Sequence, residues 1–86
     1  MPAKELKDKY GGNSRMAMNR AIRSECPGGN EVLDALELFH KIVLRHGEYE
    51  PDGRTPTVAQ VAHDRLSAIA DAMENEMRKR YGMTPL

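Results

Sequence analysis

The segment 31–46, EVLDALELFHKIVLRH, is apolar around most of its circumference when it is wound as a helix. At 100° per residue its apolar side chains sweep roughly two-thirds of the circle, and the polar strip left over is Asp34, Glu37, Lys41 and Arg45. Such a helix must be covered on several sides, and a chain of 86 residues has little material with which to cover it. We therefore expect this helix to form the core, and a second chain to complete its covering.

Clusters of glycine and proline divide the chain into four helical segments, which span about 2–10, 14–25, 31–46 and 57–81. No segment alternates polar and apolar residues over a useful length, so no strand is expected. The predicted fold is all-α. It is a small helical bundle of two short N-terminal helices and a long helical hairpin, in a single domain covering residues 1–86.

Residues typical of helix ends flank these segments. Asn13 or Ser14 is expected to cap the second helix, and Asn30 to cap the third. Gly47 suits the end of the third helix. For the fourth helix, the sequence TPTVAQ allows Thr57 paired with Gln60, or alternatively Thr55 with Pro56 at the first helical position.

The lengths of the last two helices favour self-association. At 1.5 Å per residue they span roughly 24 and 37 Å, so about 13 Å of the fourth has no partner in the third. The two short helices supply few apolar side chains to cover the remainder. We expect a homodimer or a higher closed oligomer joined through the third and fourth helices. The residues predicted at that interface are Leu38, Phe39, Ile42, Val61, Ala68, Ala72, Met73 and Met77.

The stretch KYGGNSR, residues 9–15, has the parts of an anion site. Its glycines let backbone N–H groups converge before a helix start, where negative charge is favoured, and a lysine and an arginine flank it. It does not match the GxxxxGK spacing of a phosphate loop. The alternative is that the glycines end the first helix and Asn13 or Ser14 caps the second.

The second helix gathers three arginines on the side opposite its apolar stripe. Arg and Met are enriched at protein interfaces, and Arg clasps carboxylates and phosphates with two parallel hydrogen bonds. A solvated helix face is the alternative. The set predicted to bind a partner or an anion is Lys9, Asn13, Ser14, Arg15, Met16, Asn19, Arg20 and Arg23.

No pattern in the sequence indicates an enzyme, a cofactor or a metal. The spacing of His40, His46 and His63 does not form a metal site, and His40 falls within an apolar arc, as a core or interface histidine does. The loop 46–54 carries three acids around Tyr49 and a Pro-Asp-Gly turn, and we expect it to reverse the chain. A docking role for this loop is the alternative.

Charge and cysteine content bear on partners and location. Thirteen Lys and Arg balance thirteen Asp and Glu, which gives no general attraction to nucleic acid or to an anionic membrane. The single Cys26 cannot form an internal disulfide, so a reducing compartment, the cytoplasm, is expected. No apolar run approaches the ~20 residues of a membrane span.

Two functions remain from these observations. The first is a small protein-binding accessory or regulatory module, non-enzymatic and self-associating, that meets another protein with an acidic surface. Helical proteins of this size are common among phage and mobile-element genes. The second is a binder of a phosphate-bearing ligand, nucleic acid or nucleotide, through the basic N-terminal face. Sequence-specific reading of DNA is not expected, because aromatic side chains for stacking are few.

Overall fold

The computed structural model describes residues 2–86, and side chains from residue 3 onward. It contains four helices: α1 (Pro2–Tyr10), α2 (Ser14–Glu25), α3 (Gly29–His46) and α4 (Val58–Arg80). No strand occurs in the described part of the chain; one isolated bridge pairs Tyr49 with Pro56. The predicted all-α class is confirmed, and the helix ends lie within two residues of those expected.

The residues that end the helices mostly match expectation. The side chain of Asn13 accepts a hydrogen bond from the backbone N–H of Met16, and that of Thr57 accepts one from Gln60. Gly47 ends α3 with a φ of 95°. The expected cap of α3 is wrong: Gly28, in the left-handed region, precedes the helix, and Asn30 lies inside its first turn. Because Gly28 and Gly29 follow Pro27, the chain can turn sharply, and the helix starts two residues earlier than expected.

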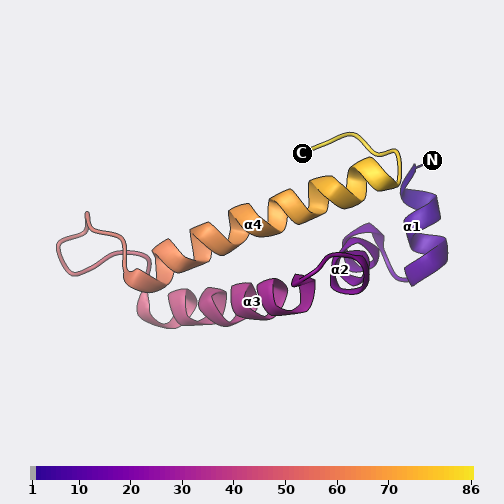
Figure 1. The fold of residues 1–86 in the computed structure, drawn as a ribbon. Helices are drawn as coiled ribbons and strands as arrows, with labels where there is room; N and C mark the ends of the chain where they lie inside the picture. The colour runs from indigo at the N-terminus through magenta and orange to yellow at the C-terminus, as the bar shows by residue number, and fades with distance from the viewer. Residues whose placement is uncertain (1) are drawn as a thin grey trace.

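The helices form an elongated molecule rather than a closed bundle. Figure 1 shows α3 and α4 running antiparallel side by side, with α2 crossing one end of this hairpin and α1 lying beyond it. The molecule measures 47 × 22 × 20 Å, and its radius of gyration is 15.0 Å. A compact domain of this length has a radius of gyration of about 12 Å. The excess arises because the hairpin extends away from the two short helices.

The buried core lies where α1 and α2 meet the C-terminal end of α4. Its buried residues are Leu6, Ala17, Met18, Ala21, Ile22, Met77 and Tyr81. The expectation that the third helix forms the core is wrong. The short helices pack against each other and against the end of α4, so they are not available to cover the length of α3.

Helix α3 is correspondingly open to solvent. Gly29 is its one buried residue among those described, and the side chains of Leu38 and Leu44 are 56% and 73% exposed. Along most of its length, α4 is the helix that packs against it, as Figure 1 shows. One flank of this apolar helix is therefore covered, and its other flanks are not.

The crossing of α2 and α3 depends on Gly29. A Cβ atom built on this residue would lie 2.1 Å from the carbonyl oxygen of Ile22. No side chain fits at that distance, so the two backbones touch directly at this point. This contact sets the position from which the hairpin extends.

Candidate functional site

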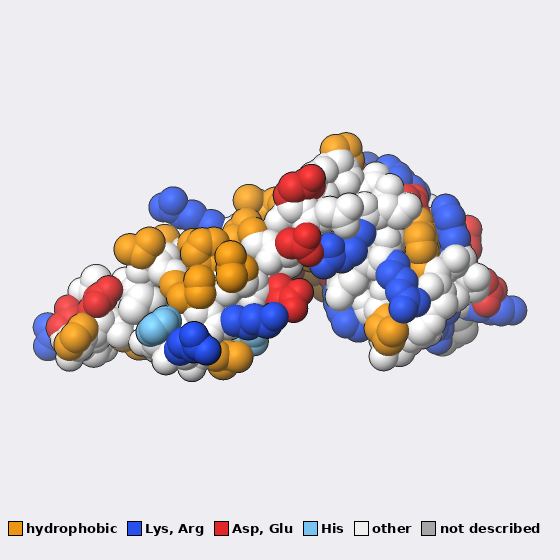
Figure 2. Space-filling view, turned by 90° about the horizontal axis from the view of Figure 1, so that it is seen from below, with side chains coloured by type: hydrophobic (Ala, Val, Ile, Leu, Met, Phe, Trp, Pro, Cys, Tyr) orange, Lys and Arg blue, Asp and Glu red, His pale blue; other side chains and the backbone are white. Residues whose placement is uncertain are grey.

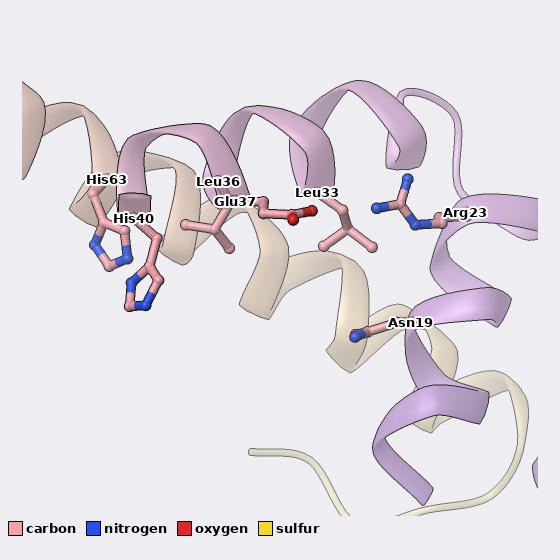
Figure 3. Close-up of a pocket in the computed structure, with 7 residues that line it drawn as sticks. All are labelled: Asn19, Arg23, Leu33, Leu36, Glu37, His40 and His63. Carbon is pink, nitrogen blue, oxygen red and sulfur yellow. The ribbon is translucent and has the colours of Figure 1, made fainter. Parts of the chain in front are cut away.

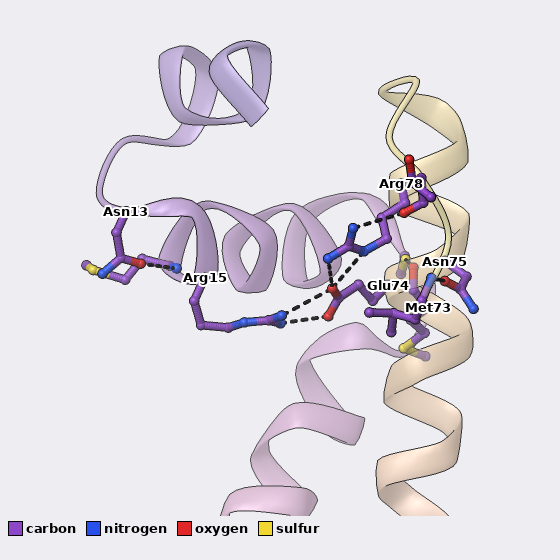
Figure 4. A network of polar contacts seen from close by, with 10 residues as sticks. Asn13, Arg15, Met73, Glu74, Asn75 and Arg78 are labelled. Atoms are coloured by element: carbon purple, nitrogen blue, oxygen red, sulfur yellow. Dashed lines mark hydrogen bonds and ion pairs between the residues drawn. The ribbon is translucent and has the colours of Figure 1, made fainter. Parts of the chain in front are cut away.

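The guanidinium of Arg15 is engaged within the chain. Its two terminal nitrogens donate to the two carboxylate oxygens of Glu74 at 2.7 and 3.1 Å, and Arg78 donates to the same carboxylate at 2.9 Å (Figure 4). Glu74 is only 4% exposed. Burial alone would raise its pKa, but the hydrogen bonds from Arg15 and Arg78 and their charges bring the pKa below its ordinary value. This network fastens α2 to α4.

The other cations of the predicted binding set also have internal partners. Arg20 donates to the backbone oxygen of Tyr10 at 2.8 Å, and Arg23 donates to Asp34 at 2.8 Å. Lys9 contacts the hydroxyl of Tyr81 at 3.2 Å. A phosphate or an acidic partner would therefore compete with acceptors that the chain already supplies.

The remaining members of that set divide between capping and surface positions. Asn13 caps α2, and Ser14 is the first residue of that helix. Met16 is 43% exposed and Asn19 is half-buried beside α3. Gly11 donates its N–H to the carbonyl of Lys7, as expected for a residue that ends α1. The stretch KYGGNSR thus joins two helices in the way that its simpler interpretation predicts.

A second polar cluster, which the sequence analysis missed, surrounds Glu25 at the end of α2. Its carboxylate accepts hydrogen bonds from the hydroxyls of Tyr10 and Tyr81 and from Arg80 at 3.0 Å. Burial by itself would raise the pKa of Glu25, yet these donors and the charge of Lys9 hold its pKa at about 2. The cluster joins α1, α2 and α4, and no spacing in the sequence signals it, because the groups that donate to Glu25 lie 15 to 56 residues away from it.

A shallow cavity of about 390 Å³ lies between the start of α3, α2 and α4. Figure 3 shows His40 and His63 side by side at one end and Arg23 at the other, with Leu33 and Leu36 between them. The two imidazole rings are 5.7 Å apart. No group of three metal-ligating side chains is found among the described residues. The cavity combines an apolar floor with polar ends.

The predicted interface residues fall into three groups: exposed, half-buried, and packed in or against the core. Leu38 is 56% exposed, Val61 is 37% exposed, and Ala68 and Ala72 are exposed as well, whereas Phe39 and Ile42 are half-buried. Met77 is 1% exposed and Met73 packs against the core. The placement of Met77 at an interface is therefore wrong, because α1 and α2 already cover the end of α4. Met73 is largely covered by the same packing.

One side of the hairpin carries apolar side chains of both helices beside a groove that Lys41, Arg45 and His46 also line. The rings of His40 and His63 lie together on one side of α3 and α4. Leu38 precedes His40 by two residues and Ile42 follows it by two, so both project on the opposite side, where they line a common groove. By the same helical geometry Ala62 and Ile69 of α4 border that side. We call this surface the hairpin face, and its residues are Ala35, Leu38, Ile42, Ala62 and Ile69. Figure 2 shows hydrophobic side chains gathered over this half of the molecule.

Three residues of the hairpin face, Ala35, Ala62 and Ile69, are outside the set predicted at an interface. Ile69 is 47% exposed although it lies at helical spacing from the apolar residues Leu66 and Met73 of α4. Its exposure could not be foreseen, because periodicity locates apolar residues on a helix without telling which flank another helix covers. Ala35 is small and half-buried, and its place on the hairpin face follows from its spacing of three residues from Leu38.

The loop 47–57 is ordered by its own hydrogen bonds. The N–H of Glu50 donates to the carbonyl of Thr55 at 2.8 Å, and that of Thr57 donates to Glu48 at 3.0 Å. Asp52 accepts from the backbone and hydroxyl of Thr55, which lowers the pKa of its carboxyl group. The loop reverses the chain, as expected, and holds Tyr49 at 53% exposure.

Comparison of the chain with protein families, curated proteins and solved structures found no match. In the described residues, no helix combines the length and apolar character needed to cross a membrane.

Proposed function

We propose that this protein is a small protein-binding module of the accessory or regulatory kind, and that its binding surface is the hairpin face. The observation that carries the proposal is the exposure of Leu38 and Ile69, 56% and 47%, on neighbouring helices with no helix of the described chain above them. Apolar surface left in water is costly, at roughly 25 cal/mol per Å². Contiguous apolar patches on small proteins mark interaction sites.

The basic N-terminal face supports the second candidate, a phosphate-bearing ligand, less well. Its arginines are held by Glu74, Asp34 and a backbone carbonyl. An apolar contact does not require these internal bonds to break, so the hairpin face is the surface available without rearrangement of the helices.

Site-specific photo-cross-linking in the cells that naturally express the chain tests the proposal. A benzophenone side chain replaces Leu38 in one variant and, as a control, exposed Lys7 on α1 in another. Irradiation is expected to give discrete cross-linked protein from position 38 and none from position 7. Equal yields from both positions, or no product from position 38, would overturn the assignment of the hairpin face.

A further inference from the structure

A row of five α3 residues runs through the hairpin face and continues to one charged residue at each end. The residues have a spacing of four, three, four and three: Glu31, Ala35, Leu38, Ile42 and Arg45. This spacing keeps side chains on one line along a helix and is the spacing by which two helices pack together. We call this row the α3 seam. Its central residue, Leu38, is 56% exposed, so the row lies to the side of the α4 contact.

The α3 seam is complementary to itself when its direction is reversed about Leu38. Reversal brings Glu31 opposite Arg45, small Ala35 opposite larger Ile42, and Leu38 opposite itself. We propose that the occupant of the hairpin face is a second copy of this chain, whose α3 packs antiparallel to the first with Leu38 on the two-fold axis. The inference rests on the proposed function and specifies its partner.

Charge decides the direction of this pairing. The first half of the seam is acidic and the second half basic, so a parallel pair would place Glu31 beside Glu31 and Arg45 beside Arg45. Within the described part of the chain neither residue forms an ion pair, whereas Glu37 and Lys41 satisfy each other at 3.2 Å. A purely acidic or purely basic partner helix would suit one half of the seam and oppose the other. A second copy suits both.

The size of the face indicates a reversible dimer. Eighteen helical residues span about 27 Å, and two packed helices are about 20 Å wide, so each copy contributes on the order of 500 Å². The total of roughly 1,000 Å² reaches the lower limit of specific interfaces. The balanced charge of the chain adds no general repulsion between copies. We therefore expect a dissociation constant in the micromolar range.

Sedimentation equilibrium and light scattering on the full chain test this arrangement, from a few micromolar to a few hundred micromolar protein. The wild type is expected to shift from 9.7 kDa to twice that mass as concentration rises. Leu38→Glu is expected to stay monomeric. Because this side chain is more than half exposed, circular dichroism of the variant should match that of the wild type.

Charge reversal tests the direction of pairing. Glu31→Arg and Arg45→Glu, each alone, place two like-charged pairs across the two-fold axis, and each is expected to weaken dimerisation about tenfold. The double variant restores opposite charges and should return to the wild-type dissociation constant. Asp8→Arg on α1, an exposed reversal outside the seam, should leave it unchanged.

The outcomes separate this inference from the proposed function. A wild type that stays monomeric at all concentrations, or a dimer that Leu38→Glu leaves intact, overturns pairing through the hairpin face. A dimer that Leu38→Glu dissociates but whose charge variants do not follow this order overturns the antiparallel arrangement. If purified chains are monomeric while position 38 still cross-links to another protein in cells, the proposed function stands and the second copy is excluded.

Discussion

At the scale of single residues, the polar side chains of this protein mainly join helices to one another. Glu74 receives two arginines from different helices, and Glu25 receives two tyrosine hydroxyls and an arginine. Both carboxylates are well shielded from solvent, and both hold their negative charge through these donors. Replacing one member of such a group by a neutral side chain leaves the other members with an uncompensated charge. This costs more folding free energy than the loss of an exposed ion pair.

Acid should weaken the fold partly through Glu25. Its pKa in the folded chain is about 2, below its ordinary value of 4.5, so its contribution to stability is complete above pH 4.5 and disappears as pH falls toward 2. We expect Glu25→Gln to lower the free energy of unfolding at neutral pH by about 2 kcal/mol, allowing for partial screening by solvent. Urea unfolding followed by circular dichroism at several pH values measures this.

The informative quantity is the difference in the free energy of unfolding between the wild type and Glu25→Gln, because Glu74 also titrates at low pH. That difference should shrink between pH 4.5 and pH 2. Glu37→Gln, which alters an exposed pair within α3, should change stability by a few tenths of a kcal/mol at every pH. A constant difference across the pH range for Glu25→Gln would contradict the assigned pKa.

Sequence spacing reveals polar contacts only within one helix. Glu74 and Arg78 are four residues apart, in the order that favours an ion pair on a helix, and they form one at 2.9 Å. Glu76 and Arg80 have the same spacing, but Arg80 pairs with Glu25 instead. The contact of Arg15 with Glu74 spans 59 residues, and only the packing of α2 on α4 brings them together.

At the scale of elements, the helix boundaries were predictable and the covered faces were not. Capping by Asn13 and Thr57 and the end of α3 at Gly47 depend on residues close together in the chain, so they can be predicted from the sequence. Which flank of an apolar helix is buried depends on where neighbouring helices lie. Helix α3 was expected to form the core because it is the most apolar helix. The core lies instead where α1 and α2 pack on the C-terminal end of α4.

The crossing of α2 and α3 should tolerate no side chain at position 29. We expect Gly29→Ala to lower the free energy of unfolding by at least about 3 kcal/mol, because the new methyl group would overlap the carbonyl of Ile22 and force the helices apart. Gly53→Ala is the control. Gly53, unlike Gly29, has a positive φ of 71°, which disfavours a side chain, but it has open space around it, so the change should cost about 1 kcal/mol. Equal losses for the two variants, measured by urea unfolding, would show that the close contact is absent.

At the scale of the whole molecule, the buried core lies at one end, and most of the large exposed apolar side chains lie on the hairpin and its loop. Leu6, Ile22 and Met77 are the largest fully buried side chains, and all lie at the end formed by α1, α2 and the last turns of α4. The hairpin beyond them has only the contact between its own two helices. Unfolding should therefore begin at the loop 47–57 and reach the core end last.

Hydrogen exchange measured by mass spectrometry checks this gradient. In dilute, monomeric protein we expect the amides of α2 and of α4 after residue 70 to exchange most slowly, and those of the last turns of α3 and the first turns of α4 to exchange faster. Ile22→Ala, a core deletion costing about 2 to 5 kcal/mol, should accelerate the slow set. Uniform protection along α4 in the wild type would argue against the gradient.

The distance between the core end and the hairpin face has a consequence for how this protein can change over generations. Under the proposed function, substitutions at Leu38 or Ile69 would alter what the hairpin face binds, while barely touching the side chains that keep the chain folded. Binding and folding would then be subject to separate selection. A lineage carrying this scaffold can acquire a new associate through a few surface replacements without passing through an unfolded ancestor.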